Sequence, residues 1–244
     1  MEERLTKDEK KALRKLEWQE ESKKKTRSET FKKYSIWIGG LVLIILAIGG
    51  LMWLVSQPTT TQNETVNIAP ISKRDISEGD KNAKVTLVEY ADFQCPACAA
   101  YHPIVTQLLE SYKGKIFYTY RMFPLTQVHP NSHISAQAAY AAFKQGAFFT
   151  YDDQLYNNQK DWADQQDPSN IFVDYAKALK LDVNKFKTEM NSDEAKKYVN
   201  DSEQEALSEG MNATPTFIVN GNKITNPAGL EEFKKIIDNE LNKK

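Results

Sequence analysis

The stretch DFQCPACAAYHP, residues 92–103, contains both cysteines of a chain of 244 residues. Cys95 and Cys98 are separated by a proline and an alanine. The run before them, residues 83–93, is largely apolar and rich in β-branched and aromatic residues, which predicts a strand buried on both faces. Pro96 suits the first turn of a helix, because its missing N–H would have no partner there. The cysteines are therefore predicted to lie at a strand-to-helix junction.

A cysteine in the first turn of a helix has particular chemistry. The unsatisfied backbone N–H groups there carry partial positive charge, which stabilises a thiolate and lowers its pKa. Cys98 lies one turn further on the same face, so the pair can close a small disulfide and open it again. We expect Cys95 to be the accessible nucleophile that forms a mixed disulfide, and Cys98 to be the more buried thiol that resolves it.

Other uses of the pair are weighed against this one. A structural disulfide across so few residues removes little entropy from the unfolded chain. For a zinc site, His129 and His133 could complete a Cys2His2 set with Cys95 and Cys98. The 30 residues between the two pairs far exceed the roughly 12–15 of a zinc finger. A zinc-stabilised binding domain is kept as an alternative, while the main prediction includes no cofactor and no metal.

The pattern beyond the junction alternates between strands and helices. Residues 115–123 predict a second strand, which gives a β-α-β unit. A helical block is expected at about residues 129–209. Residues 214–224 predict a hairpin around an Asn-Gly turn, and residues 230–241 predict a closing amphipathic helix. The predicted fold class is α/β.

Two further positions favour redox chemistry. Glu89 lies six residues before Cys95 in an otherwise apolar strand. A buried carboxylate there would have a raised pKa and could accept or return the proton of Cys98; the alternative is an edge position that faces solvent. Thr214 and Pro215 open the late hairpin. A cis proline would turn the Thr214 backbone toward the disulfide, where an extended substrate could pair with it.

The N-terminal part carries a different signal. Residues 1–33 hold 12 Lys/Arg and 8 Asp/Glu, whereas residues 36–55 are 20 residues without a charge, enough to span about 30 Å of hydrocarbon. We predict a charged cytoplasmic segment over 1–33, a transmembrane signal anchor over 34–56 and a linker over 57–80. Basic residues before the apolar run place the N-terminus in the cytoplasm and the remaining domain, 81–244, outside.

Composition narrows the function. The net charge is −1, with 41% hydrophobic and 27% charged residues, which is typical of a folded protein and gives no sign of nucleic-acid binding. Having only two cysteines suits an oxidising compartment, where a stray thiol would invite wrong pairings.

These features together resemble the DsbA-type thiol-disulfide oxidoreductases of the thioredoxin superfamily, in particular their membrane-anchored Gram-positive relatives. The resemblance rests on the acid before Cys-Pro-x-Cys, the junction, the helical insertion and the Thr-Pro of the hairpin. MFPL (residues 122–125) and HPNSHISAQAAYAA (residues 129–142) also resemble the family's passage from sheet into insertion. The resemblance covers about residues 76–241 and implies a thioredoxin fold with these roles: cis-Pro215, nucleophilic Cys95, resolving Cys98 and the buried acid Glu89.

The implied activity is oxidation of newly exported proteins that carry free thiols, with a membrane redox partner that reoxidises the site. The chain departs from the best-known members between the cysteines. They often carry histidine there, whereas Ala97 offers neither charge nor hydrogen bond, so thiolate stabilisation falls to the helix end and the Thr214 hydroxyl. A reductase or isomerase fed by a membrane donor is therefore an alternative. His102, one turn past Cys98, either faces the site or lies at the surface.

Overall fold

The computed structural model describes Trp18, Ile44, residues 46–50, Met52 and residues 64–243. The chain divides into two compact units, residues 1–60 and 61–244. Every described residue of the first unit is helical. Among the described residues, no helix is both long and apolar enough to cross a membrane. The predicted cytoplasmic segment and signal anchor fall mostly on residues outside the described set.

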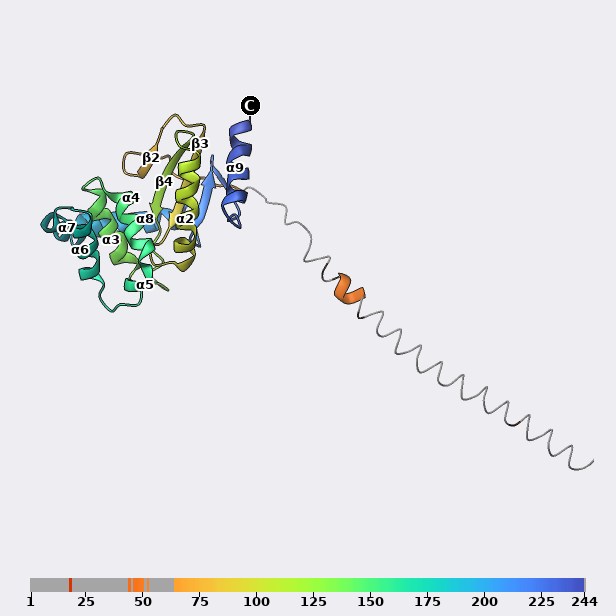
Figure 1. Cartoon of the computed structure of the whole chain (residues 1–244), viewed down its shortest axis with the longest axis horizontal. Coiled ribbons are helices and arrows are strands. Elements are labelled where there is room, and N and C mark those ends of the chain that lie inside the picture. The colour runs from red at the N-terminus through yellow and green to blue at the C-terminus, as the bar shows by residue number, and fades with distance from the viewer. Residues whose placement is uncertain (1–17, 19–43, 45, 51, 53–63, 244) are drawn as a thin grey trace, which may run out of the picture. The chain divides into compact units, whose positions relative to one another are not determined.

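The second unit is built on a mixed sheet of six strands (Figure 1). In chain order the strands are β1 (Glu64–Thr65), β2 (Ile76–Gly79), β3 (Val85–Ala91), β4 (Ile116–Met122), β5 (Thr216–Val219) and β6 (Asn222–Lys223). Their order in the sheet is β1-β6-β5-β3-β4-β2. β3 and β4 are parallel, and every other pair is antiparallel. The predicted β-α-β unit and late hairpin are both present.

The helices of the second unit fall into two groups. α2 (Pro96–Ser111) connects β3 to β4 and packs against α9 (Leu230–Asn242), the last helix. The others lie between β4 and β5 and gather into a lobe beside the sheet (Figure 1). They are α3 (Ser132–Phe143), α4 (Phe148–Asn157), α5 (Gln159–Trp162), α6 (Ser169–Ala178), α7 (Val183–Met190) and α8 (Asp193–Ser208). The lobe therefore occupies the stretch where the sequence suggested a helical insertion.

β3 lies in the middle of the sheet, with β4 on one side and β5 on the other, and five of its seven residues are apolar. Successive residues of a strand face opposite sides. Leu87 and Ala91 belong to a large core that also contains Cys98, while Val88 and Tyr90 belong to a smaller core. Leu87, Glu89 and Ala91 occupy alternate positions along the strand, so the side chain of Glu89 is on the same face of the sheet as the other two. Its carboxylate is therefore directed into the core that holds Cys98.

The linker prediction is wrong for residues 64–79, which fold onto the domain. β1 pairs with β6, and β2 pairs with β4. Between these strands Val66, Ile68 and Ile71 pack against the smaller core. The segment reads as a linker because its strands are short edge strands and its few apolar residues are separated by polar ones.

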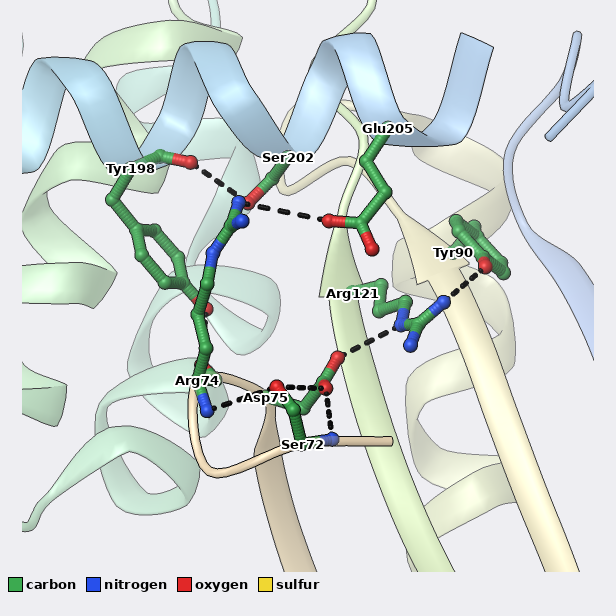
Figure 2. Close-up of a pocket in the computed structure, with 8 residues that line it drawn as sticks. All are labelled: Ser72, Arg74, Asp75, Tyr90, Arg121, Tyr198, Ser202 and Glu205. Carbon is green, nitrogen blue, oxygen red and sulfur yellow. Dashed lines mark hydrogen bonds and ion pairs between the residues drawn. The ribbon is translucent and has the colours of Figure 1, made fainter. Parts of the chain in front are cut away.

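A buried arginine ties this segment to the sheet (Figure 2). Arg121 on β4 donates from Nε to Asp75 Oδ1 at 2.8 Å and from Nη2 to Ala69 O at 2.8 Å. Its Nη1 donates to Tyr90 Oη at 2.7 Å and lies 3.3 Å from Glu209 Oε1. Glu209 in turn accepts from the Ala69 amide and the Tyr90 hydroxyl. The guanidinium of Arg121 therefore joins the segment 64–79, β3 and the C-terminal end of α8.

We expect Arg121→Met to lower the free energy of unfolding by about 3–5 kcal/mol, because it leaves Asp75 and Glu209 as buried charges without a cation. Urea denaturation of the whole chain measures this loss. Arg74→Met is the matched control. The Arg74 side chain is 47% exposed and its ion pair with Glu205 is 3.6 Å long, so its loss should cost no more than about 1 kcal/mol. Equal losses in the two variants would contradict the interpretation that Arg121 is a buried cation holding residues 64–79 to the sheet.

Candidate functional site

The cysteines lie at the start of α2. Cys95 is the N-cap residue, and Pro96 occupies the first turn of the helix. The Cys95 amide donates to Asp92 O at 3.1 Å, which closes the turn between β3 and α2. Both thiols are free, and Cys98 is fully buried while Cys95 is 7% exposed. The sulfur of Cys95 thus lies at the positive end of the helix, with the second thiol one turn inside.

The two thiols differ strongly in acidity. The pKa of Cys95 is lowered to about 5, first by the hydrogen bond from the Cys98 thiol and also by the backbone N–H groups of Ala97 and Cys98; burial opposes the shift. The pKa of Cys98 is raised well above its ordinary value, first by burial and then by Cys95 and the charge of Glu89. At neutral pH the first sulfur is therefore a thiolate and the second a thiol, which is the asymmetry that a nucleophile and a resolving thiol require.

The Thr214-Pro215 segment lies against the first sulfur. Its peptide bond is cis, as the family resemblance implied. The protonated Cys95 thiol donates to Thr214 O at 3.4 Å. The Thr214 hydroxyl has no hydrogen-bond partner of standard geometry among the described residues, yet this side chain also lowers the pKa of Cys95. The hairpin thus places both a backbone carbonyl and a hydroxyl beside the sulfur of Cys95.

Glu89 is 4% exposed, and it lies on a central strand rather than at an edge that faces solvent. Its Oε2 accepts a hydrogen bond from Tyr118 Oη at 2.6 Å. Burial raises the pKa of Glu89 to about 7, although the Tyr118 hydrogen bond lowers it. A carboxyl with such a pKa can exchange a proton near neutral pH. Because its charge also raises the pKa of Cys98, the protonation of Glu89 and that of the Cys98 thiol are coupled.

The raised pKa of Glu89 makes stability depend on pH. A carboxyl that binds its proton more tightly in the folded state loses stability as the pH rises from 4.5 to about 7, here by about 3 kcal/mol. In a Cys95→Ala, Cys98→Ala background, which removes the titrating thiols, Glu89→Gln should abolish this loss. Urea denaturation at pH 4.5 and pH 8 tests it: the gain from the amide should appear only at the higher pH. A gain of equal size at both pH values would contradict a buried carboxyl with this acidity.

The structure does not assemble the Cys2His2 set. His129 Nδ1 lies 2.7 Å from Asp92 Oδ2, and His133 Nε2 lies 2.7 Å from Asn200 Oδ1. In the described part of the chain, no three His, Cys, Asp or Glu side chains are grouped so that they could hold a metal ion. The two histidines instead form hydrogen bonds that hold the start of the helical lobe.

Side chains that the sequence analysis missed hold the junction in place. The buried carboxylate of Asp92 accepts from the Gln94 amide at 2.8 Å. Gln159 donates from Nε2 to Phe93 O at 2.7 Å and to Cys95 O at 3.0 Å. An acid at the end of a strand is a recognisable signal for a turn, so Asp92 could have been suspected. Gln159 belongs to α5 in the helical lobe, and no pattern in the neighbouring sequence predicts its contact with the junction.

His102 neither lines the cysteine pair nor lies free at the surface. Its ring stacks on Tyr156 with centroids 4.9 Å apart, and its Nε2 lies 2.9 Å from Asp153 Oδ1. Burial lowers the pKa of His102, although Asp153 raises it.

Comparisons with known proteins agree with this geometry. A family model described as Thioredoxin matches residues 72–239, more than half of the chain. The probable disulfide bond formation protein D of Bacillus anthracis is 34% identical over 176 residues, which cover 68% of this chain and 78% of that protein. The structure of oxidised BdbD from Bacillus subtilis aligns with a TM-score of 0.65 at 24% identity, covering 74% of this chain and 100% of that one.

A second group of relatives is much longer. The Na(+)/H(+) antiporter NhaA 3 of Salinispora tropica is 37% identical over 164 residues, which cover 67% of this chain but 24% of that protein. The chain therefore spans about a quarter of the length of such relatives, and their names describe those longer proteins. The family match and the fold lead to one classification: the chain belongs to the thioredoxin family.

Proposed function

We propose that the chain is a dithiol oxidase that passes the Cys95–Cys98 disulfide to exported proteins with free thiols. The observation that carries this proposal is the position of Cys95 as the N-cap of α2, with the buried Cys98 one turn inside the helix. This arrangement lowers the pKa of Cys95 to about 5 and raises that of Cys98. A stabilised thiolate stabilises the reduced form of the pair. A dithiol whose reduced form is stabilised is a strong oxidant.

The reaction consists of two exchanges. A substrate thiolate attacks Cys95 Sγ in the disulfide, the S–S bond breaks, and Cys98 leaves as a thiolate that takes a proton from Glu89. A second substrate thiolate then attacks the substrate sulfur of the mixed disulfide, and Cys95 leaves as a stabilised thiolate. The substrate loses two electrons and gains a disulfide, while the enzyme becomes the dithiol. A membrane redox partner that accepts two electrons would restore the Cys95–Cys98 bond.

The direction of transfer can be tested by stoichiometry. The oxidised chain is mixed with a reduced peptide that carries two cysteines, in the absence of other oxidants. The proposal expects each chain to convert one peptide to its disulfide form and to gain two thiols itself. If the peptide stays reduced while the reduced chain readily opens the same peptide's disulfide, the chain is a reductase instead.

We further propose that the chain is anchored in the cell membrane as a single-pass protein, like the Gram-positive members that it resembles. The support is the uncharged run of residues 36–55 and the basic residues before it, which favour an external catalytic domain. Since the chain has only two cysteines, a membrane-impermeant maleimide added to intact cells after mild reduction reports on their side of the membrane. Labelling of Cys95 in intact cells is expected; labelling only after lysis would contradict the proposal.

A further inference from the structure

Glu89 is connected to a polar pocket that the two exchanges do not use. The pocket has a volume of about 200 Å³. Tyr118, whose hydroxyl bonds to Glu89, lines it together with four titratable side chains, Glu78, His102, Asp152 and Asp153. The rest of the lining is apolar apart from one threonine. We call this space the acidic pocket. Neither cysteine is among the described residues that line the acidic pocket. The pocket is therefore separate from the small exposed part of Cys95.

A buried acid in this pocket lacks a full set of partners. Asp152 on α4 is 6% exposed, and its Oδ1 has no hydrogen-bond partner among the described residues. Its Oδ2 lies 3.5 Å from His102 Nδ1. On the other side of the ring, His102 Nε2 lies 2.9 Å from Asp153 Oδ1, and the Asp153 side chain is 48% exposed. A buried carboxyl is thus linked through an imidazole to a carboxylate in water.

The fully buried Cys98 needs a route for its proton. When a mixed disulfide covers Cys95, the substrate lies over the opening of the site. The proton that Cys98 gives to Glu89 or takes from it must then be exchanged through the protein. Glu89 is itself buried, and the Tyr118 hydroxyl that bonds to it belongs to a side chain that also borders the acidic pocket.

We propose that Glu89 exchanges its proton with solvent through the Tyr118 hydroxyl and the acidic pocket, where Asp152 is the proton acceptor. This inference rests on the proposed function and deepens it. Electrons then enter and leave at Cys95, whereas protons enter and leave through a different opening.

The proton balance is clearest for reoxidation by glutathione disulfide. Cys95 first attacks this oxidant, forms a mixed disulfide and releases one glutathione thiolate. Cys98 then gives its proton to Glu89 and attacks Cys95 Sγ; the Cys95–Cys98 bond forms, and the second glutathione leaves as a thiolate with the electron pair. Glu89 passes the proton to Tyr118 Oη, while Tyr118 releases its own proton into the acidic pocket that it shares with Asp152; Asp152 accepts this proton, which then reaches water. Two electrons have moved to glutathione, and one proton has left through the pocket.

The charges around the route suit such a transfer. Burial raises the pKa of Asp152 well above its ordinary value, and the charges of Glu89, Asp153 and Glu78 raise it further. Burial also raises the pKa of Tyr118, so the hydroxyl stays protonated and passes a proton by accepting one as it donates another. The titratable groups near Glu89 and Asp152 come from four elements, and no Lys or Arg lines the described pocket. They are Glu78 on β2, Cys98 and His102 on α2, Tyr118 and Tyr120 on β4, and Asp153 and Tyr156 on α4.

The test is the rate of the resolving step in single-turnover reoxidation by glutathione disulfide, followed by acid quench and mass spectrometry. Asp152→Asn removes the acceptor without touching the Tyr118–Glu89 bond, and Tyr118→Phe removes the connecting hydroxyl but keeps the ring. Each variant should resolve the mixed disulfide at least about tenfold more slowly at pH 7, with a changed pH profile. The rate at which iodoacetamide alkylates Cys95 should stay at the wild-type value.

Glu110→Gln is the matched control, because Glu110 lines only the neighbouring pocket, and its resolving rate should equal that of the wild type. Wild-type resolving rates in Asp152→Asn or in Tyr118→Phe would overturn the proposed route. Alkylation of Cys95 that slows in parallel would also overturn it, because the variants would then act through general packing. A wild-type chain that forms no mixed disulfide at all would instead refute the proposed function.

Discussion

Cys98→Ser is expected to stop the reaction at the mixed disulfide and to accumulate covalent adducts through Cys95. The nucleophile keeps its place at the helix end, where backbone N–H groups still lower its pKa. With the resolving thiol gone, no intramolecular attack can release the bound partner. Turnover of a dithiol substrate should fall to the uncatalysed background, while the first exchange with a disulfide substrate proceeds.

Non-reducing gels and mass spectrometry of the purified variant measure these adducts. Cys95→Ser is the control and should form none, because Cys98 is fully buried and the pKa of its thiol is raised well above the ordinary value. Adducts on Cys98 in that control would contradict the assignment of roles. So would a Cys98→Ser variant that remains free of adducts in the presence of excess disulfide.

The second large effect concerns the reduction potential of the pair. The pKa of Cys95 falls from 9.0 to about 5. The reduced state is therefore stabilised progressively as the pH rises above 5, by at most about 5 kcal/mol once the pH exceeds 9, and by less where solvent screens the sulfur. At about 1.4 kcal/mol per 30 mV, this makes the pair up to about 120 mV more oxidising than one with ordinary thiols. The stabilisation is lost as the pH falls toward the lowered pKa of Cys95. The pH dependence of the reduction potential therefore shows whether Cys95 is a thiolate.

Between about pH 5 and pH 9, reduction of the disulfide takes up two electrons and one proton, because only Cys98 is protonated. The potential should therefore fall by about 30 mV per pH unit in this window and by about 59 mV per unit below it. Titration in the Glu89→Gln variant removes the other nearby group that ionises in the same range. A slope of about 59 mV per unit throughout would show that Cys95 is not a thiolate at neutral pH.

Several features of the fold and site could be predicted because they depend on neighbours in the sequence. The apolar run before Cys95 predicts β3, and Pro96 predicts the start of α2. The Asn-Gly pair adopts the positive φ values of a tight hairpin turn. The position of Glu89 in a largely apolar strand predicts a buried acid, and the central place of β3 in the sheet explains that burial.

What could not be predicted depends on contacts between distant residues. β1 and β2 are edge strands whose partners supply most of their stability, so their own sequences resemble a linker. Tyr118 meets Glu89 only because β3 and β4 pair in a particular parallel register. The histidines spaced like zinc ligands are instead bound by Asp92 and Asn200. Spacing along the chain cannot show such partners.

The most direct test of the account is the reduction potential of the Cys95–Cys98 pair in the whole chain at pH 7. The chain is equilibrated in glutathione buffers, alkylated, and weighed by mass spectrometry, so that each state is counted directly. A two-electron transition near about −120 mV would be that of a dithiol oxidase, as the thiolate at the helix end predicts. A transition near about −270 mV would be that of a reductase and would contradict the proposed direction of transfer.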